Sequence, residues 1–168
     1  MINLVKLNYT SDKVDEILKE MAIITIDNLS YIYGDDMKSN ENIKSYVEYK
    51  KQAKPITYLM YDETSIFGYL TLSLSSKILY IEDIQIKNSY RNNPGVMSMI
   101  LKTITIEYLE NKNQIDKVVY YINKKNKLSQ HNFSKFAEKT EETKNSYMYE
   151  LNLEHPFIVK MIDKVKKQ

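Results

Sequence analysis

The chain has 168 residues, with 24 Lys and Arg against 22 Asp and Glu, and no cysteine. A net charge of +2 lacks the basic excess of a dedicated nucleic-acid-binding protein. Without cysteine the chain has no disulfide, thiolate metal site or cysteine nucleophile, and this composition is typical of a reducing compartment. No stretch approaches the roughly 20 apolar residues of a transmembrane helix. We therefore expect a cytoplasmic protein with neither nucleic acid nor membrane as partner.

The length, without any linker-like stretch, predicts a single domain over residues 1–168. Helical and strand periodicities, with turn and cap residues between them, give the expected elements in chain order. These are a strand at 3–8, a helix opened by Ser11 and Asp12, a helix at 39–52, strands at 56–61, 66–74 and 79–86, a helix from Pro94, a strand at 118–122, a helix at 128–139, a strand at 147–153 and a helical tail from Pro156.

This order predicts an α/β (α+β) fold with a mixed, mostly antiparallel central sheet flanked by helices. The strand at 79–86 is apolar on both faces apart from three polar residues, which is typical of a central strand. It should run parallel to the strand at 118–122, because a long helix connects them in a right-handed crossover. The tail at 155–168 is amphipathic and basic, and a packed terminal helix is favoured over a membrane-surface helix.

Several chemistries find no support in the sequence. Only His131 and His155 are present, so a zinc site would need both of them plus a carboxylate from distant segments, and no metal is expected. Composition leaves a Ser-His-acid triad open, but no Gly-x-Ser-x-Gly turn occurs. With three glycines in all, the chain has neither a P-loop nor a dinucleotide-binding fingerprint.

The stretch from 79 to 98 combines features that suit a binding site. Glu82 and Asp83 interrupt an apolar strand, and a turn then leads to a helix start with Asn93 as cap and Pro94 as first residue. The free N–H groups at a helix start form a site for an anion such as a pyrophosphate. A structural strand with acids at its exposed end, followed by an ordinary capped helix, explains the pattern equally well.

The same stretch resembles the central motif of the GNAT N-acetyltransferases. The run from Tyr80 to Ile86 (Tyr-Ile-Glu-Asp-Ile-Gln-Ile) and the pair Tyr90-Arg91 match that motif, most nearly in its spermidine/spermine (diamine) acetyltransferase branch. Gly68-Tyr69 resembles the Gly-Tyr or Gly-Phe of an earlier family strand. Asn126, Ser129, Phe133 and Lys135 resemble a second family motif at the following helix.

The resemblance implies a GNAT fold and acetyl-CoA as co-substrate. It implies that Glu82 is the general base, and Asp83 is a candidate for holding a cationic substrate. It implies cofactor contacts along the strand, around the turn and on the later helix. Those residues are Ile84, Gln85, Ile86, Arg91, Asn92, Asn93, Gly95, Val96, Met97, Ser98, Asn126, Ser129 and Phe133.

The sequence also departs from the family pattern. Gly95 alone remains of the usual glycines in the turn, which is one residue longer. Phe133 stands where members of the family have a tyrosine that acts as general acid.

Three functions remain open. The favoured one is transfer of an acetyl group from acetyl-CoA to a primary amine, by direct attack in a ternary complex. The acceptor is a small-molecule amine or a protein amino group. The protein could form a homodimer. The alternative is a GNAT-fold protein that binds acyl-CoA or a partner protein without efficient turnover. The third is a structural or interaction protein that shares only the fold.

Overall fold

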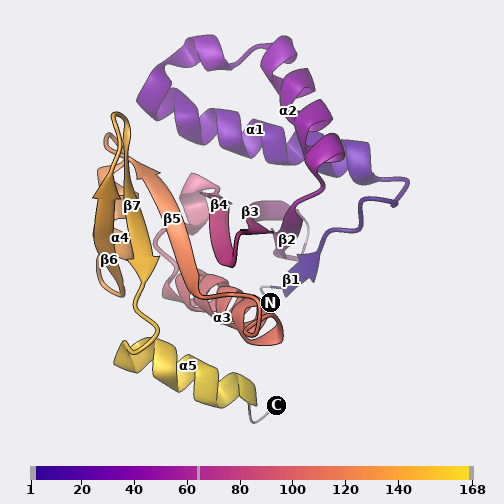
Figure 1. Ribbon diagram of the computed structural model, residues 1–168. Coiled ribbons are helices and arrows are strands. Elements are labelled where there is room, and N and C mark those ends of the chain that lie inside the picture. The colour runs from indigo at the N-terminus through magenta and orange to yellow at the C-terminus, as the bar shows by residue number, and fades with distance from the viewer. Residues whose placement is uncertain (1–2, 64, 167–168) are drawn as a thin grey trace. The chain divides into compact units, whose positions relative to one another are not determined.

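The computed structural model describes residues 3–63 and 65–166. The elements, labelled as in Figure 1, are β1 Asn3–Lys6, α1 Val14–Tyr33, the 3-10 helix η1 Asp35–Met37, α2 Asn40–Ala53, β2 Ile56–Tyr61, β3 Ile66–Ser75, β4 Ile78–Ile86, the 3-10 helix η2 Asn88–Tyr90, α3 Pro94–Glu110, β5 Lys117–Asn123, α4 Lys127–Phe133, β6 Ala137–Glu142, β7 Ser146–Leu151 and α5 Pro156–Lys166. The strand order is β1-β2-β3-β4-β5-β7-β6, so β4 is central as predicted.

The chain forms two compact units, and β3 and β4 pass from one to the other. The first unit comprises residues 1–72 and 83–93, and the second comprises residues 73–82 and 94–168. The prediction of one domain over residues 1–168 stays a prediction.

In the first unit, two helices cover a meander of strands. β1 pairs antiparallel with β2, and β2 pairs antiparallel with β3. The core joins Leu18, Met21 and Ile24 of α1 to Leu59 of β2 and Tyr69 of β3. α1 and α2 pack against each other, as Figure 1 shows for the two purple helices. Burial of these apolar side chains stabilises the unit through the hydrophobic effect.

In the second unit, β4 pairs parallel with β5, as predicted from the helix between them. β5 pairs antiparallel with β7, and β7 pairs antiparallel with β6. α3 buries the regularly spaced side chains of Val96, Ile100 and Ile104, and its outer side carries α5 (Figure 1). The structure therefore has the predicted mixed, mostly antiparallel sheet flanked by helices.

Most predicted boundaries are correct within two residues. Ser39 caps α2 as its side chain accepts a hydrogen bond from the Asn42 N–H at 3.1 Å. α1 begins at Val14 instead of directly after Ser11 and Asp12, and its cap position, Lys13, makes no side-chain cap bond.

The helix predicted at 128–139 is the main error. α4 ends at Phe133, and residues Ala137–Glu142 form β6 instead. Ala137 pairs with Leu151, and the Asn152 N–H donates to the Phe136 carbonyl at 3.0 Å. Pairing with a strand distant in sequence overrides the helical spacing of Ser129, Phe133 and Phe136.

Among the described residues, every helix is too short or too polar to cross a membrane. The predicted tail helix is present as α5, and it buries Ile158 and Met161.

Candidate functional site

A buried hydrogen-bond network is centred on Tyr69 in the first unit. Tyr69 lies on β3 with its side chain fully buried, and its hydroxyl donates to Asp83 Oδ2 at 2.7 Å. The same hydroxyl accepts from the Tyr46 hydroxyl at 2.9 Å and bonds to the Thr25 hydroxyl. α1, α2, β3 and β4 therefore each contribute one side chain to a single polar cluster, which fixes their mutual positions.

Burial sets the titration behaviour of this cluster. Desolvation raises the pKa of Tyr69 well above its usual value, and the nearby Asp83 carboxylate raises it further. The pKa of Tyr46 is also raised, mainly by burial and in part by Asp83. Both hydroxyls are therefore protonated at neutral pH: Tyr46 donates its proton to the Tyr69 hydroxyl, and Tyr69 donates to the Asp83 carboxylate.

The network continues from Asp83 to Arg91. The second Asp83 oxygen, Oδ1, accepts from Gln85 Nε2 at 2.8 Å, and Gln85 Oε1 accepts from Asn28 Nδ2 at 2.7 Å. Asn28 Oδ1 then accepts from the Arg91 guanidinium. The Ile86 carbonyl accepts from both Asn28 Nδ2 and Arg91 Nε, each at 3.2 Å. Asp83, Gln85, Ile86 and Arg91, all predicted site residues, are thus brought together.

Asn28, like Thr25 and Tyr46, was not predicted as a site residue from the sequence. It is a half-buried amide on α1 that serves three partners, Gln85, Ile86 and Arg91. A single asparagine in an ordinary amphipathic helix gives no local signal of such a role.

The turn after β4 is held by Tyr90. Its ring stacks on Phe67 with centroids 4.2 Å apart, and its hydroxyl donates to Asp62. That hydrogen bond is the main cause of the raised pKa of Tyr90. The backbone is fixed as well, because the Lys87 N–H donates to the Phe67 carbonyl at 2.7 Å. Arg91 therefore directly follows a well-defined 3-10 turn, and Asn92 and Asn93 are exposed beyond it.

Two predicted acids differ in their surroundings. Glu82 is exposed to solvent, although its neighbours along the strand are mostly apolar. Asp83 is half-buried, and each of its carboxylate oxygens accepts one hydrogen bond: Oδ2 from Tyr69 and Oδ1 from Gln85. Any contact of Asp83 with a cation has to compete with these donors. Ile84 is half-buried beside it on β4.

In the second unit, α3 begins at Pro94 as predicted and has no acidic residue in its first turn. Gly95 and Ser98 are exposed, Met97 is half-buried, and Val96 is buried in the core at 1% exposure. An anion at this helix start would meet backbone N–H groups without a competing carboxylate from the same turn. Val96 can contribute only its backbone, because its side chain faces the core.

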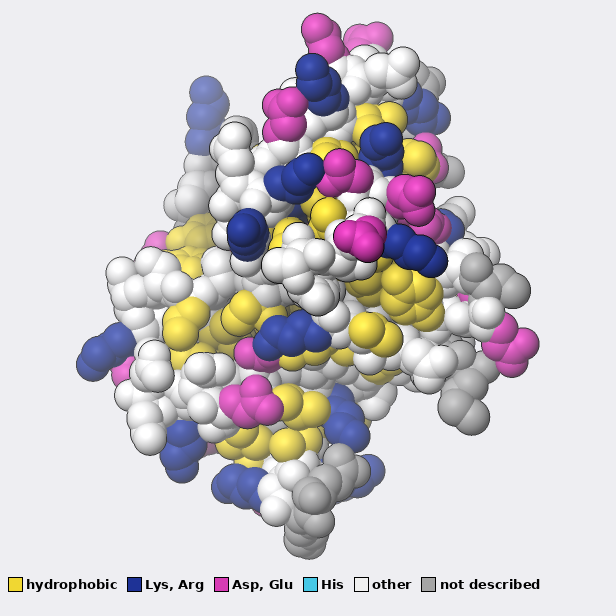
Figure 2. Space-filling view, turned by 90° about the vertical axis from the view of Figure 1, so that its right-hand side faces the viewer, with side chains coloured by type: hydrophobic (Ala, Val, Ile, Leu, Met, Phe, Trp, Pro, Cys, Tyr) yellow, Lys and Arg dark blue, Asp and Glu magenta, His cyan; other side chains and the backbone are white. Residues whose placement is uncertain are grey.

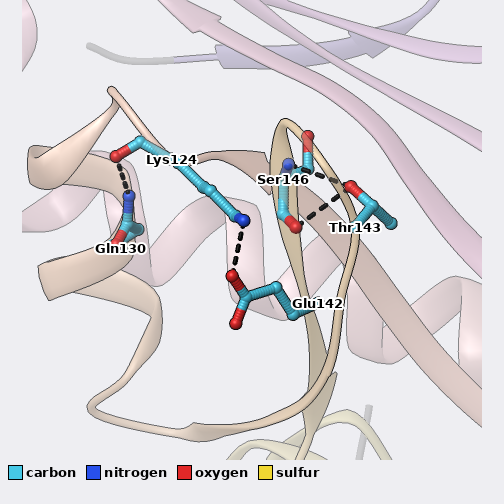
Figure 3. Close-up of polar contacts among 5 residues, drawn as sticks. All are labelled: Lys124, Gln130, Glu142, Thr143 and Ser146. Atoms are coloured by element: carbon cyan, nitrogen blue, oxygen red, sulfur yellow. Dashed lines mark hydrogen bonds and ion pairs between the residues drawn. The ribbon is translucent and has the colours of Figure 1, made fainter.

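The start of α4 is tied to the end of β5. Asn126 Oδ1 accepts from the Ser129 N–H at 3.0 Å, which makes Asn126 the helix cap. Gln130 Nε2 donates to the carbonyls of Lys124 and Asn123 at 2.9 and 3.1 Å, and the first of these bonds appears in Figure 3. Figure 3 also shows Lys124 paired with Glu142 of β6, beside the Thr143–Ser146 turn. The pairing lowers the pKa of Glu142.

Phe133 ends α4 inside an aromatic cluster. It is 3% exposed, and its ring centroid lies 4.8 Å from that of Tyr120 and 5.7 Å from that of Phe136. Phe133 is therefore a core residue, whatever contact its ring edge makes with a ligand. Asn126, Ser129 and Phe133 share one short helix, so the structure brings these three predicted residues together.

Several solved structures with a similar fold are acetyltransferases. The PaiA N-acetyltransferase of Thermoplasma acidophilum, in complex with coenzyme A, matches with a TM-score of 0.64 and 15% identity over 90% of this chain and 98% of its own. A GNAT family acetyltransferase of Elizabethkingia anophelis with acetyl-CoA bound gives a TM-score of 0.59 and 14% identity over 89% and 97% of the two chains. An acetyltransferase of Thermus thermophilus gives a TM-score of 0.69 and 11% identity over 89% and 96%.

These likenesses establish the fold of the chain as that of the GNAT acetyltransferases. No protein-family model matches the sequence, and no curated protein matches it significantly. The narrower resemblance to the diamine branch gains no support from these comparisons.

Proposed function

We propose that this protein transfers an acetyl group from acetyl-CoA to a primary amine of a small molecule or a protein. The observation that carries the proposal is the fold, which it shares with acetyltransferases solved with coenzyme A or acetyl-CoA bound. The start of α3 supports it, because its first turn offers N–H groups and no carboxylate to an anion. The absence of cysteine is in keeping with action in the cytoplasm.

The proposed reaction is direct attack of the amine on the thioester carbonyl, with both substrates bound. A free alkylamine has a pKa of about 10, so nearly all of it is protonated at neutral pH and needs a base before attack. Glu82 is the proposed base, and its exposure suits proton removal through a water molecule. The amine nitrogen then forms a bond to the carbonyl carbon, the carbon–sulfur bond breaks, and the sulfur leaves as a thiolate that takes up a proton.

The cofactor residues have separate proposed roles. Backbone groups of Ile84, Gln85 and Ile86 would pair with the pantetheine arm in the manner of an added strand. Arg91, Asn92 and Asn93 before the helix, and Gly95, Val96, Met97 and Ser98 within it, would surround the pyrophosphate. Asn126, Ser129 and Phe133 would line the far side of the cofactor.

A second function is favoured by Phe133. The family that the sequence resembles uses a tyrosine at this position as acid, whereas here a buried phenylalanine packs on Tyr120 and Phe136. A protein that binds acyl-CoA without efficient turnover would retain the fold and lose this acid. A thiol with a pKa of about 8.5 is still a tolerable leaving group unaided, so the acetyltransferase remains the first proposal.

Thermal unfolding with acetyl-CoA, followed by turnover assays on a panel of amines, tests both functions. Ligand at 100 times its dissociation constant should stabilise the protein by about 2.7 kcal/mol. Stabilisation with turnover supports the acetyltransferase, and stabilisation without turnover on any amine supports the binding protein. Unchanged melting at millimolar acetyl-CoA would contradict both.

A further inference from the structure

A groove in the second unit has three lysines and no acidic side chain among its lining residues. It lies between α3 and α5 and has a volume of about 530 Å³. Its lining residues are Ser98, Lys102, Phe157, Lys160, Met161, Lys164 and Val165. Such a lining favours an anion that also has an apolar surface.

The lysines come from both walls of the groove. Lys102 lies one turn after Ser98 on α3, about 6 Å further along the helix axis. Lys160 and Lys164 are also one turn apart, on α5, and both are exposed. Like charges around one hollow repel one another, and a bound anion offsets that repulsion. In Figure 2, lysine or arginine side chains lie beside hydrophobic ones at the lower end of the view, where α5 lies, and an acidic side chain borders the same hydrophobic area.

The apolar part of the groove lining consists of three side chains of α5. Met161 is buried, Val165 is half-buried, and Phe157 is 42% exposed, so an aromatic ring stands at the surface beside the lysines. An aromatic side chain on a surface offers a face on which a nucleobase or sugar can stack. The groove therefore suits a phosphate attached to a nucleoside better than a bare inorganic ion.

The position of the groove along α3 indicates which phosphate group it could bind. The groove includes Ser98, the fifth residue of α3, and the pyrophosphate of the proposed co-substrate would lie at the first turn of the same helix. Coenzyme A carries a phosphomonoester at the 3′ position of the ribose that bears this pyrophosphate. Such a group has a charge of about −1.5 to −2 at neutral pH.

We propose that the groove between α3 and α5 binds the 3′-phosphate and adjoining nucleoside of coenzyme A, with Lys102, Lys160 and Lys164 neutralising the phosphate. This inference rests on the proposed function, since it assigns a further part of the same co-substrate to a surface that extends beyond the motif residues, of which only Ser98 lines the groove. It gives the terminal helix α5 a part in binding, in addition to its packing on α3.

Binding of coenzyme A and of 3′-dephospho-coenzyme A, measured by calorimetry on the whole chain, tests the proposal. We expect coenzyme A to bind about 10- to 100-fold more tightly, because the two ligands differ only by a charged group that accepts hydrogen bonds from lysines. The preference should shrink as ionic strength rises, since the lysines of α5 are exposed. The double variant Lys160→Gln/Lys164→Gln should lose most of the preference and leave the affinity for 3′-dephospho-coenzyme A unchanged.

Lys112→Gln, an exposed lysine beyond the end of α3, is the matched control and should keep the full preference. Equal affinity of the wild-type protein for the two nucleotides would overturn this inference while leaving the proposed function intact. This measurement does not depend on whether any variant folds. A double variant that keeps the preference would also overturn it. If that variant instead lost binding to vesicles of anionic phospholipid, α5 would be a membrane-binding helix. Binding of neither nucleotide would contradict the proposed function itself.

Discussion

Gly68 of β3 passes so close to the backbone of Gln85 on β4 that position 68 has no room for a side chain. A Cβ atom there would lie 2.5 Å from the Gln85 carbonyl oxygen and 3.3 Å from the Ile86 Cα. Both are backbone atoms, so neither can rotate away from the added atom. The segment they belong to is the one proposed to pair with the pantetheine arm.

Gly68→Ala should therefore move the β4 backbone or strain it. We expect a loss of about 1–3 kcal/mol in the free energy of unfolding, measured with urea, together with weaker acetyl-CoA binding. Gly34→Ala is the control: nothing lies within 4 Å of its added Cβ, and its cost comes only from a φ of +92°. The Gly34→Ala variant should keep the wild-type affinity for acetyl-CoA. Equal affinity of the Gly34→Ala and Gly68→Ala variants would contradict the proposed role of β4.

Tyr69→Phe removes the hydroxyl at the centre of the buried network. The change leaves the Asp83 carboxylate and the Tyr46 hydroxyl without the partner that each now has in Tyr69. The free energy of unfolding should fall by about 1–3 kcal/mol. Tyr121→Phe, at a tyrosine 44% exposed on β5, should change it by less than about 0.5 kcal/mol. Equal stability of both variants and the wild type would show that the network contributes nothing.

The same network predicts loss of stability in alkali. Burial raises the folded-state pKa of Tyr46 above its usual 10.0, so the folded protein keeps this proton when the unfolded chain has lost it. The resulting stabilisation is complete below pH 10 and declines as the pH rises from there, by about 1.4 kcal/mol per pH unit for each such tyrosine. Urea unfolding between about pH 9 and about pH 11 measures this slope, which should be shallower in Tyr46→Phe.

The sequence predicted the elements more completely than it predicted these side-chain relationships. Pro94 fixed the start of α3 and Ser39 that of α2, because cap and first-turn residues act locally. β6 was missed because its charged, exposed sequence has no alternation, and its pairing with β7 is a tertiary effect. Asn28 bonds to residues 57, 58 and 63 positions away, and no local pattern encodes such contacts.

Glu82→Gln tests the proposed base. The substitution keeps the size of an exposed side chain and removes its capacity to accept a proton, so turnover should fall by about 10²- to 10⁴-fold. Acetyl-CoA affinity should be unchanged, since the amide alters neither the strand nor the helix start. Glu138→Gln, an exposed glutamate on β6, serves as control and should keep full turnover. Wild-type rates for Glu82→Gln across neutral pH would refute the assignment.

Phe133 is both a core residue and the position at which the resembling family has its general acid. Because it is 3% exposed and packs on Tyr120 and Phe136, Phe133→Ala should cost about 3–5 kcal/mol of folding stability. Phe133→Tyr keeps the ring and adds a hydroxyl, which is tolerated only if the hydroxyl finds a partner or a ligand atom.

If the edge of this ring faces the thioester, the added hydroxyl can protonate the departing sulfur, and Phe133→Tyr should equal or exceed the wild-type turnover. Turnover with a panel of amines and the melting temperature with and without acetyl-CoA together decide the matter. A folded variant that binds acetyl-CoA but loses turnover would mean that position 133 is not the acid position. Activity present only in Phe133→Tyr, with a wild type that binds acetyl-CoA and acetylates no amine, would establish the non-catalytic binding protein in place of the acetyltransferase.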